Sequence, residues 1–390
     1  MRRIRPLAIA ALLTACGGES VPDVARLEIE PGSTMVVGVG ASAAFHAVAF
    51  DSSGRSTSAR DAVWRSGDPG VASVSSSGMA TAVGSGVTRI IADIGGVADT
   101  ATFEVWVAPT VEAYEAGTSY FGRNGYVEYI PGTLPLVLSA PHGGALAPPE
   151  IPDRTWGTVV TDSYTRETLL AVRDAFLGQT GQAPHVVISH LKRTKLDPNR
   201  EIGEAAQESP FAENAWEEFH GFIEIATDRV AEDLGSGFYL DLHGHGHEIQ
   251  RLELGYLLSA SDLNQNDDGL DGTSFALKSS VAALAQASPL SFSALVRGET
   301  SFGAYLAEQG IRSVPSPGDP SPGSDSYFSG GYNTFRHGSR DGGTVSGLQI
   351  EMHRPGIRDT EGNRRAFGMG LARAVERFML EHYGFFAQGG

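Results

Sequence analysis

The sequence is short of cysteine, of positive charge and of long hydrophobic runs. Its one cysteine, Cys16, excludes an intrachain disulfide and a structural zinc site built on several thiolates. Lys and Arg total 29 against 46 Asp and Glu, so phosphate groups would repel the chain and a nucleic-acid partner is not expected. Beyond the N-terminus, no apolar run approaches the ~20 residues of a membrane-spanning helix. The 390 residues favour two domains or one large one.

The first twenty residues have the pattern of an export signal. A basic segment comes first, formed by Arg2, Arg3 and Arg5. A short apolar run then ends at Cys16, and the segment 13–17 resembles the lipobox of bacterial lipoproteins. The resemblance implies a signal peptide over residues 1–16, a tether over 17–24, and export to the outer membrane or cell surface with a lipid on Cys16 as the only anchor. The alternative is a secretory signal that happens to contain a cysteine.

Residues 25–108 are predicted to form a β-sandwich, because short strands alternate with Gly, Ser and Asp turns. The strand-like runs are 26–30, 43–50, 63–64, 71–74, 87–92 and 100–107. The segments 51–54, 63–68 and 71–74, with Gly78 and Gly84, make this region similar to group-2 bacterial immunoglobulin-like domains. Such domains are usually spacers or adhesive modules. We expect Trp64 to lie in the core.

Residues 109–390 show a different pattern, in which strand-like and helical runs alternate. Strands are predicted at 134–139, 185–189, 237–242 and 348–352. Helices are predicted at 162–177, 214–234, 279–286, 300–309 and 363–382. This alternation predicts an α/β domain with a mainly parallel sheet flanked by helices, whose sites form at the carboxyl ends of the strands. The segment 313–343, rich in Gly, Pro and Ser, is expected to be a mobile loop that acts as a lid, with disorder as the alternative.

Four polar clusters follow predicted strands in this domain. They occupy residues 139–144, 197–201, 241–248 and 349–354. His142 precedes two glycines, which permit a sharp turn that leaves the imidazole exposed at the sheet edge, where a neutral ring suits zinc. A hydrogen-bonding histidine in a turn is the alternative. Asp241 and His243 share one strand face, so Asp241 can accept a hydrogen bond from the second ring nitrogen of His243. His245 and His247 are expected to support the site, lie at the surface or bind metal adventitiously.

In this order on an α/β domain, the clusters resemble the N-formylglutamate amidohydrolases and the wider zinc carboxypeptidase-like superfamily, over residues 131–386. The resemblance implies one zinc ion held by His142, His243 and an acidic residue. Related carboxypeptidases place the acid three residues after the first histidine, where this chain has Ala145. An Asp that opens the next helix is the counterpart in formylglutamate hydrolases, and here it is Asp162.

The third ligand is therefore predicted to be Asp162, and other possibilities stay open. A helix N-cap is an ordinary role for Asp at this place. Glu167, on the same predicted helix, and Glu150 are rival ligands.

The resemblance also implies roles in catalysis. Glu351 ends a late apolar strand and would be the general base that takes a proton from the zinc-activated water. Arg193 would polarise the scissile carbonyl or bind a second carboxylate, with a surface salt bridge as the alternative. Tyr332 would offer its hydroxyl to the substrate from the predicted lid.

A second group of residues is predicted to bind the substrate. Asn199 and Arg200 match an Asn-Arg pair that binds the substrate carboxylate in the superfamily, and a planar guanidinium grips such a group with two hydrogen bonds. Arg354 would add a contact, and Asp197 would orient its neighbours.

The sequence thus predicts a zinc hydrolase acting on a small acidic amide or peptide: an N-acyl amino acid, a γ-glutamyl chain or a cell-wall peptide. The alternatives are a non-catalytic cell-surface binding module with a degenerate site and a secreted metallocarboxypeptidase.

Overall fold

The computed structural model describes residues 24–107 and 114–386. The chain divides into two compact units, Met1–Ala108 and Pro109–Gly390, and each is treated by itself. The predicted signal peptide with Cys16 and nearly all of the predicted tether lie outside the described residues. Within those residues, no helix combines the length and the apolar character needed to cross a bilayer.

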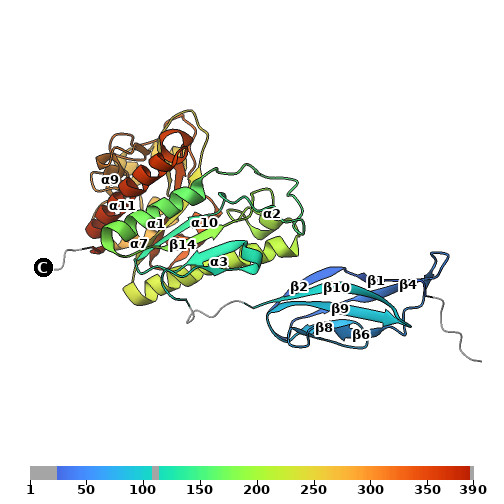
Figure 1. The fold of residues 1–390 in the computed structure, drawn as a ribbon. Coiled ribbons are helices and arrows are strands. Elements are labelled where there is room, and N and C mark those ends of the chain that lie inside the picture. Colours follow the sequence, from blue (N-terminus) through green and yellow to red (C-terminus); the bar gives the residue numbers. More distant parts are fainter. Residues whose placement is uncertain (1–23, 108–113, 387–390) are drawn as a thin grey trace, which may run out of the picture. The chain divides into compact units, whose positions relative to one another are not determined.

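The described part of the N-terminal unit consists of strands that form three sheets around one apolar core (Figure 1). The strands are β1 (Arg26–Glu30), β2 (Ser33–Val37), β3 (Ser42–Ala44), β4 (His46–Phe50), β5 (Ser56–Thr57), β6 (Val63–Ser66), β7 (Ala72–Val74), β8 (Met79–Ala82), β9 (Gly86–Ile94) and β10 (Val97–Trp106). The sheet orders are β1-β4-β5, β2-β10-β9-β6 and β3-β8-β7. A β-rich unit is therefore confirmed. Trp64 packs against this core, as expected, while remaining partly exposed.

The C-terminal unit is built on an eight-stranded mixed sheet with the order β11-β12-β14-β13-β15-β18-β16-β17. The strands are β11 (Tyr120–Phe121), β12 (Val127–Ile130), β13 (Leu136–Ala140), β14 (His185–Ser189), β15 (Gly237–Gly244), β16 (Leu252–Gly255), β17 (Ser313–Val314) and β18 (Val345–Met352). The central strands β14-β13-β15-β18 are parallel, whereas β12 and β16 join them in the antiparallel direction. The predicted parallel arrangement therefore holds for the centre of the sheet.

Helices surround this sheet. They are α1 (Thr165–Thr180), α2 (Ile202–Ala206), α3 (Pro210–Leu234), α4 (Ala260–Leu263), α5 (Asp267–Leu270), α6 (Thr273–Lys278), α7 (Ala282–Ala287), α8 (Phe292–Arg297), α9 (Phe302–Glu308), α10 (Tyr332–His337) and α11 (Glu361–Tyr383). Short helical turns are η2 (Arg123–Gly125), η3 (Ser339–Asp341) and η4 (Arg354–Arg358).

Both faces of the sheet are covered, because successive strand residues point to opposite sides. In β13, Leu136 and Leu138 belong to the apolar cluster that includes α1 and α11, whereas Val137 belongs to the cluster that includes α3. The same alternation places Leu240 and Tyr239 of β15 in the first and second clusters. The central strands are thus buried on both sides, which leaves their carboxyl ends as the place for polar side chains.

The start of helix α1 differs from the prediction. The helix begins at Thr165 rather than at Asp162, because Tyr164 has a φ of 68° in the left-handed region and cannot continue a helical path. Asp162 therefore lies in the segment before the helix, and its side chain does not cap α1.

The segment 313–343 is not the free loop that its composition suggests. It contains β17, α10 and η3, and hydrogen bonds join it to β16 and the residues that follow. The backbone N–H of Leu257 donates to the Ser329 carbonyl at 2.6 Å, and the Tyr327 hydroxyl donates to the Leu254 carbonyl at 2.6 Å.

Leu240 tests the buried centre of the sheet. We expect Leu240→Ala to lower the free energy of unfolding of the C-terminal unit by about 2–5 kcal/mol, because the side chain is fully buried and its loss leaves a cavity. Denaturant unfolding followed by helical circular dichroism checks this, since the described helices lie in this unit. The matched control is Leu177→Ala in α1, where the side chain is exposed. Equal effects of the two substitutions would contradict the prediction.

Candidate metal centre

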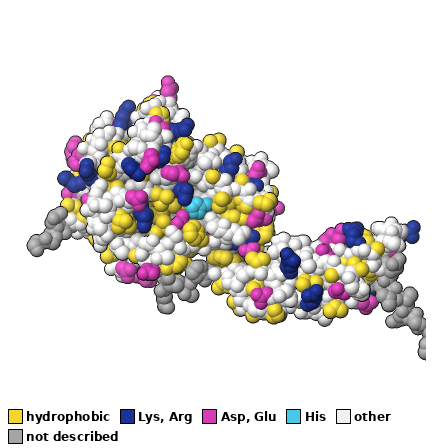
Figure 2. All heavy atoms as spheres, viewed as in Figure 1, with side chains coloured by type: hydrophobic (Ala, Val, Ile, Leu, Met, Phe, Trp, Pro, Cys, Tyr) yellow, Lys and Arg dark blue, Asp and Glu magenta, His cyan; other side chains and the backbone are white. Residues whose placement is uncertain are grey.

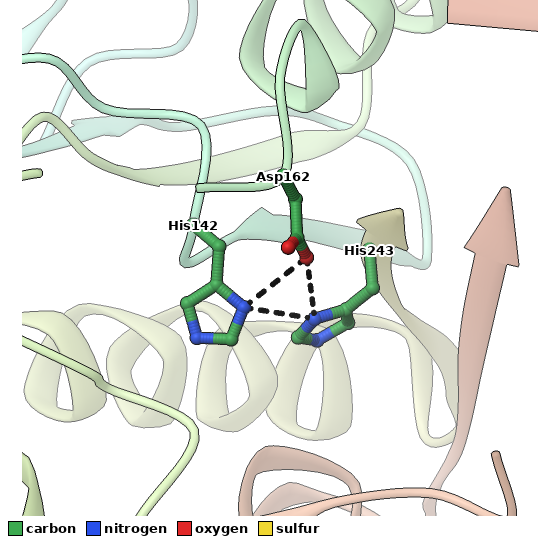
Figure 3. A group of neighbouring side chains, drawn as sticks. All are labelled: His142, Asp162 and His243. Carbon is green, nitrogen blue, oxygen red and sulfur yellow. Dashed lines mark hydrogen bonds and ion pairs between the residues drawn. The ribbon is translucent and has the colours of Figure 1, made fainter. Parts of the chain in front are cut away.

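Three side chains from separate elements converge beyond the central strands (Figure 3). His142 follows β13, Asp162 precedes α1 and His243 lies near the end of β15. The Nδ1 atoms of the two histidines are 3.1 Å apart, and Asp162 Oδ2 lies 3.3 Å from His142 Nδ1 and 3.5 Å from His243 Nδ1. Atoms bound about 2.0–2.2 Å from a tetrahedral zinc ion are roughly 3.3–3.6 Å apart. The three atoms therefore have nearly the spacing of ligands to one ion.

Two glycines place His142, although not in the way the sequence suggests. Neither Gly143 nor Gly144 has a positive φ. A Cβ on Gly143 would overlap the backbone of Arg166 in α1, and one on Gly144 would overlap the backbone of His190 after β14. Glycine is needed here because two other segments approach the chain closely, which fixes the position of the imidazole between them.

A carboxylate holds each histidine from behind. His243 Nε2 donates to Asp241 Oδ2 at 2.6 Å, as the strand periodicity predicts, and His142 Nε2 donates to Asp197 Oδ1 at 2.6 Å. Each bond holds a proton on Nε2 and turns Nδ1 toward the shared centre, where its lone pair becomes available to a metal ion once any proton on Nδ1 has left. Metal-binding histidines in proteins are oriented in this way.

Electrostatics favour a cation at this centre. Burial would raise the pKa of Asp162, but hydrogen bonds from His142 and His243 outweigh burial and lower this pKa far below its usual value. The pKa of Asp241 is also lowered, because attraction to His243 outweighs its burial. Burial would lower the pKa of His243, yet Asp241 and Asp162 raise it well above its usual value. The carboxylates stay ionised and surround the two imidazoles with negative charge, which a bound cation would offset.

Glu351 adds a carboxylate of a different kind. It lies on β18, directly across from His243 on β15, and is 5% exposed. The Gln349 amide donates to its Oε1 at 2.9 Å, while its Oε2 is buried with no hydrogen-bond partner among the described residues. Burial raises the pKa of Glu351 to about 7; Asp162 acts in the same direction and His243 opposes it. A carboxylate with these properties is suited to take and return a proton near neutral pH.

Two further predicted residues lie beside the ligands. Arg193 Nε donates to Asp197 Oδ2 at 2.9 Å, and its Nη1 lies 3.5 Å from Asp162 Oδ1. Asn199 Nδ2 lies 3.5 Å from His243 Nε2, and its Oδ1 accepts the backbone N–H of Asn333 at 2.8 Å. Because both carboxylate partners of Arg193 serve the metal centre, the arginine positions that centre.

The remaining predicted residues make their described contacts elsewhere. Arg200 Nη1 donates to the carbonyl of the preceding asparagine at 2.7 Å and its Nε donates to Glu204 Oε1 at 3.1 Å, so its described hydrogen bonds are local and none of them reaches the three ligands. Arg354 is exposed, and its guanidinium lies 5.6 Å from the ring centre of Tyr164. Tyr332 begins α10 rather than lying in a mobile loop, and its hydroxyl lies 3.3 Å from Arg336 Nη1. No described contact links the Tyr332 hydroxyl to the three ligands.

The rival ligands also lie elsewhere. Glu167 lies in the first turn of α1, where it forms an ion pair with Arg166 at 3.6 Å, and its side chain is partly exposed. Glu150 accepts a short hydrogen bond from the Tyr126 hydroxyl. Asp162 is therefore the carboxylate that the described structure brings to the two histidines, and the Ala145 position is not needed to complete the set.

Two residues of the site had no signal in the sequence. Asn333 Nδ2 donates to Asp241 Oδ2 at 3.0 Å, so α10 is fixed to the carboxylate behind His243. Arg358 in η4 is buried and donates through Nε to the Met352 carbonyl at 3.2 Å and through Nη1 to the Ser163 carbonyl. Asn333 and Arg358 lie in polar stretches of the sequence, and the pattern of these stretches does not predict which distant residues they contact. Their positions in the site therefore became known only from the structure.

The donor set fits a catalytic zinc ion. Two imidazole nitrogens and one carboxylate oxygen are a common set of three protein ligands for such an ion, and the Asp behind each histidine supplies the expected support. The three side chains are buried. On the face that Figure 2 shows, histidine reaches the surface in one small area of the C-terminal unit, bordered by hydrophobic and charged side chains.

Comparisons with known proteins found solved structures of similar shape. The N-formylglutamate amidohydrolase of Ralstonia eutropha JMP134 is 14% identical, with a TM-score of 0.41, and the match covers 65% of this chain and 99% of that chain. A gene product of Agrobacterium tumefaciens is 13% identical, with a TM-score of 0.38, over 66% of this chain and 94% of that chain. Domains 4 and 5 of an S-layer protein match 22% of this chain and 53% of that chain, at 21% identity and a TM-score of 0.19. No family model and no curated protein matches the sequence.

Asp241 tests the support behind His243. We expect Asp241→Asn to weaken zinc binding about 10–100-fold, because the uncharged amide accepts the hydrogen bond from His243 Nε2–H more weakly than the carboxylate does. Competition with a chelator of known zinc affinity measures the change. Asp174→Asn, at an exposed carboxylate of α1, is the matched control and should bind zinc like the unaltered protein. Unchanged affinity in Asp241→Asn would show that the carboxylate does not orient a ligand.

Proposed function

We propose that the C-terminal unit is a zinc-dependent hydrolase that cleaves an amide bond next to a carboxylate. The observation that carries the proposal is the convergence of His142 Nδ1, His243 Nδ1 and Asp162 Oδ2 at 3.1–3.5 Å, with Glu351 on the neighbouring strand. A zinc ion held there would activate a water molecule and polarise a carbonyl. Structural zinc sites are usually closed by four protein ligands, so a set of three favours catalysis.

Glu351 is proposed as the general base. Its Oε2 is the buried oxygen without a described partner, so that atom is free to accept the proton that the attacking water loses. The Gln349 amide holds Oε1 and thereby fixes the carboxylate plane. The same Oε2 would then donate the proton to the leaving amine. Arg193 stays bound to Asp162 and Asp197 during these steps and keeps the ligand carboxylate in place.

Arg200 is proposed to bind the carboxylate of the substrate. It follows Asn199, which touches the His243 ring, and its side chain is 34% exposed. The Glu204 carboxylate accepts from its Nε at 3.1 Å, and this partly exposed pair can be exchanged for a pair with another carboxylate. A guanidinium at this place favours acidic substrates such as N-acyl amino acids, γ-glutamyl chains and cell-wall peptides. A lipid anchor on Cys16 would place the enzyme at the cell envelope, where wall peptides occur.

Glu351 gives the direct test of the chemistry. We expect Glu351→Gln to lower kcat by about 10²–10⁴-fold while zinc content stays unchanged, because the amide cannot take a proton but preserves the shape of the side chain. Turnover of a panel of N-acyl glutamates and wall peptides, with zinc measured by mass spectrometry, checks both quantities. Chelator treatment of the unaltered protein should abolish turnover, and added zinc should restore it.

The control for this substitution is Glu361→Gln at the exposed start of α11, which should keep full activity. If Glu351→Gln turns over the same substrates as fast as the unaltered protein, Glu351 is not the base. If the unaltered protein binds no zinc and cleaves no amide on the panel, the hydrolase proposal fails.

Arg200 tests the preference for a carboxylate. We expect the unaltered protein to prefer an N-acyl amino acid over the matching carboxamide, and Arg200→Ala to reduce that preference by about 10-fold or more, because a charged hydrogen bond is lost. The ratio of kcat/KM for the two substrates measures the effect. Arg365→Ala, at an exposed site in α11, should leave the ratio unchanged. A preference that survives in Arg200→Ala would mean that another group binds the carboxylate.

A further inference from the structure

A second set of metal-binding groups lies next to the first. His245 and His247 follow β15, and Glu253 lies in β16. One ligand atom from each, a histidine ring nitrogen or a Glu253 carboxylate oxygen, can be chosen so that all three lie within 4.8 Å of one another. None of these residues has a role in the hydrolysis proposed above, so their convergence needs its own explanation.

Strand register places this second set one strand beyond the first. His243 lies across from Glu351 on β18, and Glu351 lies across from Glu253 on the antiparallel strand β16. The backbone N–H of His245 continues the strand pairing by donating to the Met352 carbonyl at 3.0 Å. The second set is therefore held by the same rigid sheet, but it shares no residue with the ligands of the first.

The tautomer of His245 leaves the lone pair of one ring nitrogen, Nδ1, available to bind a metal ion. Its Nε2 lies 2.9 Å from the Arg251 carbonyl, which can only accept, so Nε2 carries the proton. The lone pair is then on Nδ1, which lies 3.9 Å from Glu253 Oε1. A backbone carbonyl behind the ring is one of the usual supports of a metal-binding histidine. The His247 backbone N–H also donates to this Nδ1 at 3.1 Å, so the loop must give up that bond when a metal binds.

Glu253 supplies a buried charge that needs compensation. It is 1% exposed, and its Oε1 lies 2.7 Å from His247 Nδ1. Among the described residues, its ion pairs are with His245 and His247, which carry charge only when protonated. The carboxylate of Glu351 lies across the strand pair and adds negative charge. A buried carboxylate with two imidazoles beside it is stabilised by a bound divalent cation.

We propose that His245 Nδ1, His247 Nδ1 and Glu253 Oε1 form a second binding site for a zinc-like divalent ion. The ion would link the loop after β15 to strand β16. Glu253 Oε2 accepts the backbone N–H of Phe328 at 2.7 Å, and the His247 ring stacks on the Phe328 ring with centroids 4.6 Å apart. The same ion would therefore also fix the segment that precedes α10. The site does not depend on the proposed hydrolase activity.

Zinc stoichiometry of the full chain tests the proposal. Purified protein is equilibrated with zinc, freed of unbound metal by gel filtration and measured by mass spectrometry. We expect two zinc ions per chain in the unaltered protein, one in His247→Ala, one in Glu253→Gln and one in His142→Ala. The double variant His142→Ala/His247→Ala should retain none. The matched control is His46→Ala in β4, an exposed histidine, which should still bind two.

Each outcome decides the matter. Circular dichroism checks that each variant is folded. Two variants of the second site are used because a misfolded protein could also lose zinc: His247 is partly exposed, and Glu253→Gln keeps the shape of the side chain. One zinc ion in the unaltered protein that is lost in His142→Ala but kept in His247→Ala, or two ions in both His247→Ala and Glu253→Gln, would overturn the second site. Loss of one ion in these variants together with an inactive unaltered protein would support the second site and reject the hydrolase.

Discussion

The bonds from histidine to aspartate are the interactions on which the candidate metal centre depends. His142 to Asp197 and His243 to Asp241 are each 2.6 Å long and buried. They set which nitrogen of each ring carries the proton, and so they decide that both Nδ1 atoms turn toward Asp162. Asp197 and Asp241 are themselves held by Arg193 and Asn333. The ligands are thus fixed by buried polar contacts that extend through several elements.

The mixed sheet explains why so many charged groups can gather in one buried region. Its parallel centre brings the carboxyl ends of β13, β15 and β18 to one edge, and apolar clusters on both faces leave that edge to polar side chains. The antiparallel strand β16 then adds Glu253 beside Glu351. Cations offset this accumulation of carboxylates: Arg193 and Arg358 by their fixed charge, and, on our account, bound metal ions.

The sequence was sufficient to predict what depends on local pattern. The period of two in β15 placed Asp241 behind His243, and the alternation of strands and helices predicted the architecture. It could not predict tertiary neighbours: the start of α1 depends on the left-handed backbone of Tyr164, and the burial of Arg358 depends on contacts with segments far along the chain. The prediction for Tyr332 was wrong for a different reason. The Gly-rich composition suggested a mobile lid, but the chain forms helix α10 there, and Asn333 of this helix is hydrogen-bonded to Asp241.

We propose above all that one zinc ion binds between His142 Nδ1, His243 Nδ1 and Asp162 Oδ2. A crystal structure of the zinc-loaded protein, with anomalous scattering measured at the zinc edge, tests it most directly. We expect an anomalous peak about 2.0–2.2 Å from each of these three atoms, with the Nε2 atoms of His243 and His142 still bound to Asp241 and Asp197. No peak at this position, or a zinc ion held through Nε2, would contradict it.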